Sequence, residues 1–217
     1  MSGLSLPQLI AVAILPLLFG ITVHEVAHGW AAKRLGDPTA QRLGRLTLNP
    51  IKHIDPLGTI LIPGILLVLG GFIFGWAKPV PVTWENLRNP RRDMAIVAAA
   101  GPVANLLMAF LWAVFARIGA GLGDDLQWAG QPMVYMGQFG VAINSVLMVL
   151  NLLPLPPLDG GRVAVGLLPP RLAWNLSRVE PYGFFVLIAL LATGTLGVIL
   201  SPPVRWVGDV VWGLVGL

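Results

Sequence analysis

The chain has 217 residues, of which 56% are hydrophobic and only 11% are charged, and its mean hydropathy is +0.78. This composition excludes an ordinary water-soluble domain and indicates an integral membrane protein. The chain has no cysteine, which excludes disulfides and thiolate metal ligands and leaves His, Asp and Glu to bind a metal ion. The net charge of +4 does not indicate nucleic-acid binding, because the basic residues fall beside the apolar segments, where we expect them to face lipid headgroups.

Apolar windows follow one another along the chain. A helix needs roughly 18 to 20 apolar residues to cross about 30 Å of hydrocarbon. The windows that approach this length are 7–32, 57–75, 94–118, 133–155 and 182–200. The first window has no Lys or Arg before Lys33, unlike a signal peptide, so we expect it to be retained as a span. The intervals between the windows are too short to hold a separate soluble domain.

Basic residues predict which loops face the cytoplasm. The intervals 33–56, 76–93 and 157–181 are basic, whereas 119–132 contains two Asp residues and no basic residue. If the first two basic intervals both face the cytoplasm, the window 57–75 must enter the membrane and return to the same side. Its Pro and Gly residues supply the necessary breaks. We therefore predict a re-entrant segment at 57–75, with a plain fifth crossing as the alternative.

Residues 24–28 read His-Glu-Val-Ala-His inside the first apolar window. Because residues four apart lie on one face of a helix, His24 and His28 can offer two imidazole nitrogens to one ion, and Glu25 stands beside it. His-Glu-x-x-His on a helix is typical of zinc-dependent proteases, in which the Glu acts as general base. A charged group inside a span costs at least ~2.5 kcal/mol, which argues against a chance occurrence.

A third metal ligand has to come from elsewhere in the chain. The extended metzincin pattern fails, because positions 31 and 34 are Ala31 and Arg34 instead of Gly and His. The candidates that remain are His53, Asp55, Glu85, Asp159 and Glu180. Asp159 is preferred, because it follows the window 133–155 in a break rich in Pro and Gly, and because the charge pattern brings it to the inner side, like the histidine pair. His53 is the runner-up, although we favour a structural role for it.

With these residues in place, the chain resembles the site-2 proteases, a family of intramembrane zinc metalloproteases that cut transmembrane substrates. The resemblance covers nearly the whole chain and rests on His24-Glu25-Val-Ala-His28, Asn49-Pro50-Ile-Lys-His53-Ile-Asp55-Pro56-Leu-Gly58, Phe74-Gly75-Trp76-Ala77-Lys78-Pro79-Val80, Gly101-Pro102-Val-Ala-Asn105 and the block from Asn151 to Arg162. It implies that Asp159 is the third zinc ligand, that Glu25 is the general base, and that Asn151 steadies the reacting carbonyl. Members often have a PDZ or CBS domain; this chain has neither and resembles a minimal branch.

Polar residues within the apolar windows are candidates for a substrate site. Asn144 and Asn151 are seven residues apart and so share a helix face, and Asn105 lies one turn after the Gly101–Pro102 pair. We predict that Asn105 and Asn144 bind substrate, and the alternative is that they join neighbouring helices. The segment Trp76–Val82 alternates bulky and small residues and contains two prolines, which predicts an edge strand that can pair with an unwound substrate.

These observations predict an all-α polytopic membrane protein, a helical bundle of about four to five spans with a re-entrant segment and a short β-hairpin near the cytoplasmic face. We expect a single transmembrane metalloprotease domain over 1–217, with one Zn²⁺ ion, in a prokaryotic plasma (inner) membrane. Its expected partners are transmembrane protein substrates and membrane lipids, without nucleic acid. The alternatives are a membrane zinc-binding or transport protein and an inactive scaffold. No internal repeat supports a transporter, and the intact Glu25 argues against a scaffold.

Overall fold

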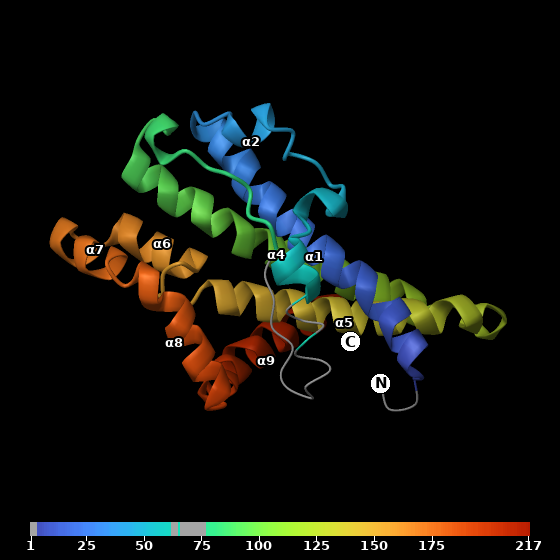
Figure 1. The fold of residues 1–217 in the computed structure, drawn as a ribbon. Helices are drawn as coiled ribbons and strands as arrows, with labels where there is room; N and C mark the ends of the chain where they lie inside the picture. The colour runs from blue at the N-terminus through green and yellow to red at the C-terminus, as the bar shows by residue number, and fades with distance from the viewer. Residues whose placement is uncertain (1–3, 62–64, 66–76) are drawn as a thin grey trace.

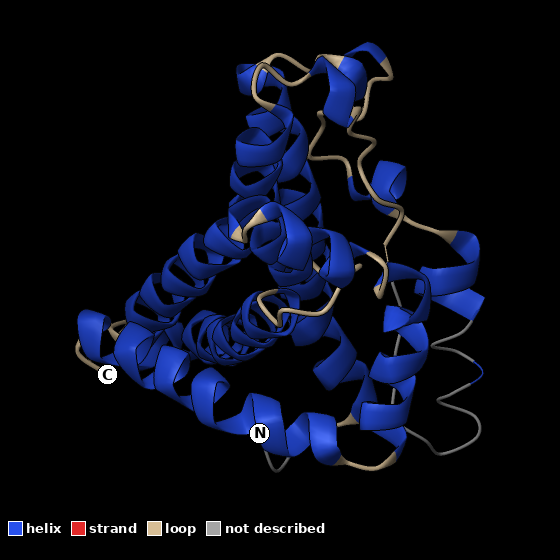
Figure 2. Ribbon diagram, turned by 90° about the vertical axis from the view of Figure 1, so that its left-hand side faces the viewer, coloured by secondary structure: helices blue, strands red, loops and turns tan. Residues whose placement is uncertain are grey.

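The computed structural model describes residues 4–61, 65 and 77–217, and these residues form helices joined by loops (Figures 1 and 2). The longer helices are α1 (Leu6–Leu35), α4 (Pro90–Ala120), α5 (Gln127–Asn151), α8 (Glu180–Ala192) and α9 (Thr195–Val215). The shorter ones are α2 (Thr39–Arg42), η1 (Pro50–His53), η2 (Pro56–Leu61), η3 (Trp84–Asn86), η4 (Asp124–Leu126), α6 (Asp159–Leu167) and α7 (Pro170–Ser177). The predicted all-α class is confirmed.

Within the described residues, four helical segments are long and apolar enough to cross a membrane, namely Leu6–Leu35, Pro90–Ala120, Asp124–Asn151 and Thr195–Val215. The bent pair of α7 and α8 makes a fifth if it counts as one span. The predicted window 182–200 is divided between α8 and α9, because Gly194 adopts a left-handed conformation with φ 72° that ends the helix. Most of the predicted re-entrant window 57–75 lies outside the described residues, so its path stays a prediction.

α4 is the central helix and packs against α1, α5, α6 and α9 (Figure 1). Small side chains allow these helices to approach closely: Ala109 and Ala113 of α4 contact Val141 of α5 and Val207 of α9 in one buried cluster. Close packing of small residues is a main source of helix association inside membranes, where the hydrophobic effect between helices is absent. α1, α4 and α5 thereby form a tight frame for side chains that point between them.

The predicted β-hairpin is wrong, because the described residues contain no β-strand (Figure 2). Residues 77–83 are extended, but three of their N–H groups donate to partners outside any β-ladder. Lys78 N donates to the His53 carbonyl (2.9 Å), and Val80 N and Thr83 N donate to the carboxylates of Glu25 and Asp37 (2.7 Å each). The prolines at 79 and 81 have no N–H to donate. The alternation of bulky and small residues in this stretch therefore indicated an extended backbone, but not a paired β-strand.

The loop after α1 fixes this extended segment to the end of the helix. Gly36 caps α1 with φ 115°, and the next residue, Asp37, is fully enclosed. Its carboxylate accepts hydrogen bonds from Thr39, Thr83 and Asn86. Burial by itself raises the pKa of Asp37, but these hydrogen bonds outweigh it and lower the pKa below its ordinary value. A charged Asp37 thus anchors residues 83–86 beside the end of α1.

Candidate active site

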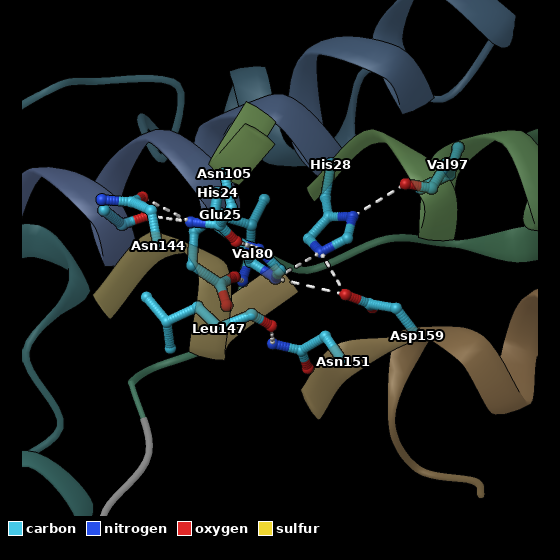
Figure 3. A network of polar contacts seen from close by, with 11 residues as sticks. His24, Glu25, His28, Val80, Val97, Asn105, Asn144, Leu147, Asn151 and Asp159 are labelled. Atoms are coloured by element: carbon cyan, nitrogen blue, oxygen red, sulfur yellow. Dashed lines mark hydrogen bonds and ion pairs between the residues drawn. The ribbon is translucent and has the colours of Figure 1, made fainter. Parts of the chain in front are cut away.

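α1 presents His24 and His28, one turn apart, to the interior of the bundle (Figure 3). Each ring is held through Nδ1: the partner of His24 is Asn105 Oδ1 at 2.6 Å, and that of His28 is the Val97 carbonyl at 2.7 Å. The Val97 carbonyl can only accept, and the Asn105 amide nitrogen already faces the Gly20 carbonyl (3.1 Å), so we assign a proton to Nδ1 of both rings. In the neutral rings, both Nε2 atoms then carry a lone pair that can bind a metal.

Asp159 reaches the two histidines from the first turn of α6. Gly160 and Gly161 allow that turn to lie directly against the preceding loop. A Cβ added at Gly160 would overlap the Leu152 carbonyl, and one added at Gly161 would overlap the Pro156 nitrogen. The Asp-Gly-Gly sequence therefore holds the start of α6 tightly enough to aim the Asp159 carboxylate at α1.

The three side chains meet at one point. The two Nε2 atoms are 3.1 Å apart, and Asp159 Oδ2 lies 3.2 Å from His24 Nε2 and 3.3 Å from His28 Nε2. Ligands bound at about 2.0–2.1 Å to one tetrahedral zinc ion stand roughly 3.3–3.4 Å from one another, so this triangle fits zinc with little adjustment. Asp159 Oδ2 is buried and has no hydrogen-bond partner in the described residues. Among those residues, no other cluster of His, Asp and Glu has this arrangement.

α4 makes room for the two rings at Gly101. A Cβ added there would lie 2.5 Å from His28 Nε2 and 2.6 Å from His24 Cε1, both closer than van der Waals contact permits. Gly101 thus allows the backbone of α4 to lie against the imidazoles, and a larger residue would have to push them aside.

Glu25 lies beside the cluster and is half-buried. Its Oε2 accepts a hydrogen bond from Val80 N at 2.7 Å, which fixes the carboxylate from the extended segment 77–83 (Figure 3). That segment is itself held by Arg45, whose Nη2 donates to the carbonyls of Lys78 (2.9 Å) and Pro79 (3.4 Å). The expected general base is therefore positioned by main chain from another part of the molecule.

The other candidate ligands lie outside the metal cluster. His53 is buried and its Nε2 contacts the Thr47 carbonyl at 2.9 Å. Asp55 accepts from the backbone N–H groups at the start of η2, and Glu180 lies 3.7 Å from Arg162. The contact with the Thr47 carbonyl suits the structural role favoured for His53.

The three asparagines differ in their surroundings. Asn105 and Asn144 are both 0% exposed and are hydrogen-bonded to each other at 2.9 Å. Asn151 is half-buried at the end of α5, and its Nδ2 donates to the Leu147 carbonyl at 2.9 Å (Figure 3). The substrate-binding role expected for Asn105 and Asn144 stays a prediction, as does the role of Asn151.

The sequence did not point to the roles of Val80 and Arg45. Val80 acts through its main-chain N–H, which no side-chain pattern encodes, and Arg45 was counted as one more basic residue of a cytoplasmic loop. The spacing of prolines on either side of Val80 was the available signal, because it leaves Val80 N as a lone donor between two residues without one.

Comparisons with known proteins identify relatives that are named as zinc metalloproteases. A profile of peptidase family M50 matches residues 12–134. "Putative zinc metalloprotease YwhC" of Bacillus subtilis is 40% identical over 190 residues, which cover 87% of this chain and 84% of the relative. "Putative zinc metalloprotease Rip2" of Mycolicibacterium smegmatis is 31% identical over 90% of this chain and 69% of the relative. "Putative zinc metalloprotease MJ0611" of Methanocaldococcus jannaschii is 33% identical over 72% of this chain and 66% of the relative. No solved structure gives a significant match.

Proposed function

Because this chain belongs to peptidase family M50 and is an intramembrane zinc metalloprotease, we propose that His24, His28 and Asp159 hold its zinc ion and that Glu25 is its general base. The observation that carries the proposal is the triangle of two Nε2 atoms and one carboxylate oxygen, 3.1 to 3.3 Å on each side. With both Nδ1 atoms protonated, each of the three atoms has a lone pair, and one cation can bind all of them at once.

Zinc, when bound, lowers the pKa of a coordinated water to about 7 and polarises a carbonyl oxygen. Glu25 takes the proton from the attacking water and passes it to the amine that leaves. Its Oε2 is occupied by Val80 N–H, and Oε1 has no hydrogen-bond partner among the described residues, so Oε1 is the oxygen that receives the proton. The fixed carboxylate needs no reorientation before it acts.

Asn151 is suited to steady the scissile carbonyl. Its amide has two N–H groups, and one of them is used by the Leu147 carbonyl. The second can donate to the carbonyl oxygen of a peptide bond next to Asp159, at the junction of α5 and α6. A donor that stabilises the developing oxyanion lowers the barrier most when it is held in place beforehand.

The substrates we propose are transmembrane proteins, cut within or beside a membrane-spanning segment. His24, Glu25 and His28 lie on α1, which is apolar enough to cross a membrane, and the basic intervals support a cytoplasmic orientation for the end of α1 that carries them. Bacterial and archaeal relatives support a prokaryotic plasma membrane. We treat 1–217 as one protease domain, because α4 joins the elements that bear the site to α9. No feature of the described residues favours a transporter or an inactive scaffold.

The test uses the purified full chain, a model transmembrane peptide and a zinc assay. Glu25→Gln is expected to keep zinc and lose cleavage, because it removes the proton acceptor but none of the ligands. Asp159→Ala is expected to lose both, and His53→Ala to keep zinc. Equal cleavage by Glu25→Gln and the parent would remove Glu25 as the base, and zinc retention by Asp159→Ala would remove the proposed ligand set.

A further inference from the structure

A line of buried amides connects three helices to the candidate zinc ligand His24. Asn144 on α5 donates from Nδ2 to the Gly140 carbonyl (2.9 Å), and its Oδ1 accepts from Asn105 Nδ2 on α4 (2.9 Å). Asn105 Nδ2 also donates to the Gly20 carbonyl on α1 (3.1 Å), and Asn105 Oδ1 meets His24 Nδ1 at 2.6 Å. Hydrogen bonds thus connect Asn144 to Asn105, and Asn105 to the ring of His24 (Figure 3).

The two amides are enclosed on all sides in the structure. Both have an exposed fraction of 0%, and each of their polar atoms already has a partner. A Cβ added at Gly20 would lie 2.9 Å from Asn144 Oδ1, so the backbone of α1 closes directly over this amide. The surroundings therefore favour a role that acts through His24.

The orientation of each amide is determined by a carbonyl that can only accept. The Gly140 carbonyl requires the nitrogen of Asn144, which turns the Asn144 oxygen towards Asn105. That oxygen and the Gly20 carbonyl both require the nitrogen of Asn105, which turns the Asn105 oxygen towards His24. Were Asn105 reversed, its N–H would face His24 Nδ1, the ring would hold its proton on Nε2, and Nε2 could not bind a metal.

We propose that Asn105 and Asn144 are positioning residues that act in series, Asn144 orienting Asn105 and Asn105 fixing the Nδ1–H tautomer and the ring orientation of His24. This proposal rests on the role of His24 as a zinc ligand. Asn144 influences the metal from a third helix, without touching the histidine. Partners that orient a metal-binding histidine typically affect metal affinity by about 10- to 100-fold.

The experiment measures the zinc dissociation constant of the purified full chain by competition with a chromophoric chelator. Asn105→Ala and Asn144→Ala are each expected to weaken zinc binding by roughly 10- to 100-fold. The double variant is expected to bind zinc no more weakly than Asn105→Ala alone, because Asn144 acts only through Asn105. Cobalt bound in place of zinc is expected to show an altered visible spectrum in both single variants, since the geometry of one ligand changes.

Ser145→Ala is the matched control, because Ser145 is the next residue on α5, is equally buried, and has an Oγ without a hydrogen-bond partner in the described residues. It is expected to bind zinc like the parent. Gly20→Ala keeps both asparagines and pushes against the Asn144 amide alone, and it is also expected to weaken zinc binding. This milder variant decides the question if the alanine variants fail to fold.

Three results would overturn the proposal. Parent-like zinc affinity with a raised KM in both asparagine variants would make them substrate-binding residues. Losses that add in the double variant would mean that the two amides act independently. Parent-like zinc affinity in Gly20→Ala would show that the position of Asn144 does not matter. His24→Ala separates these failures from failure of the proposed function, since retained zinc affinity in that variant would remove His24 as a ligand.

Discussion

Gly101 is a residue at which the lack of a side chain matters more than any contact. Its position on α4 faces the edges of both imidazoles, and the nearest ring atom would be 2.5 Å from a new Cβ. The rings have little freedom to retreat, because their Nδ1 atoms are bound to Asn105 and Val97 on the same helix. A single methyl group therefore competes directly with the geometry that zinc requires.

Gly101→Ala is expected to weaken zinc binding by at least roughly 10-fold, because the displaced rings no longer converge with Asp159. The measurement is the zinc dissociation constant, together with cleavage of a transmembrane peptide. Gly208→Ala is the matched control, since Gly208 also lies inside a helix and a Cβ there meets nothing within 4 Å. Parent-like zinc affinity in Gly101→Ala would contradict the close packing of α4 on the histidines.

The extended segment 77–83 connects Arg45, in the loop after α1, to the proposed base Glu25. Arg45 holds two of its carbonyls, the His53 carbonyl holds Lys78 N, and Val80 N holds Glu25. Val80 is itself buried, and a Cβ added at Gly29 of α1 would lie 2.8 Å from its Cγ1. The segment is therefore attached to α1 beside the candidate site, and it orients the proposed base Glu25 without contributing a proposed ligand.

Val80→Pro removes the N–H that holds Glu25 and keeps an extended backbone. A hydrogen bond to a charged group contributes about 1.5–3 kcal/mol, so kcat is expected to fall roughly 10- to 100-fold. Zinc affinity is expected to stay unchanged, because no ligand is touched. Val80→Ala keeps the N–H and serves as the control for the lost side chain. If the two variants lose the same activity, the main-chain hydrogen bond is not what matters.

At the scale of the whole molecule, the metal cluster joins the first helix to a short helix far downstream. α1 carries two of the proposed ligands and α6 the third, and α4 packs against both helices. The two imidazole nitrogens and the carboxylate oxygen lie 3.1 to 3.3 Å from one another. An ion bound by the proposed ligands would therefore cross-link elements that are distant in sequence, in addition to its part in hydrolysis.

Removal of zinc by a chelator is expected to lower the Tm of the detergent-solubilised protein, and zinc added back to raise it. A ligand present at 100 times its Kd stabilises the folded state by about 2.7 kcal/mol. Asp159→Ala is expected to show a much smaller dependence of Tm on zinc. A parent Tm that does not respond to zinc would contradict a cross-link between α1 and α6.

The sequence predicted the parts of the molecule that depend on local rules. The apolar windows gave the main helices, and helical spacing together with the Pro- and Gly-rich break led to His24, His28 and Asp159, which the structure brings together. Two local expectations failed. Pro79 and Pro81 lie in an extended segment without a paired strand, and Gly194 divides the window 182–200 into α8 and α9.

The contacts of Asn105 and Arg45 could not be predicted from the sequence. They depend on which faces of the helices meet, and the spacing of apolar residues alone does not determine that. The position of Asn105 on α4 did not show that its amide would lie between His24 and Asn144. Nor did the charge of Arg45 show that its guanidinium would hold the backbone beside Val80. Such contacts arise from tertiary packing across segments that are between 33 and 81 residues apart.

Zinc-edge X-ray absorption of the purified protein is the decisive measurement for the proposed zinc site, because it counts the imidazoles on the metal. We predict two imidazoles and one carboxylate, with bond lengths of about 2.0–2.2 Å, and loss of the carboxylate contribution in Asp159→Ala. The chain has three histidines, so a third imidazole on the metal would have to be His53. That result, or fewer than two imidazoles, would contradict a site built from His24, His28 and Asp159.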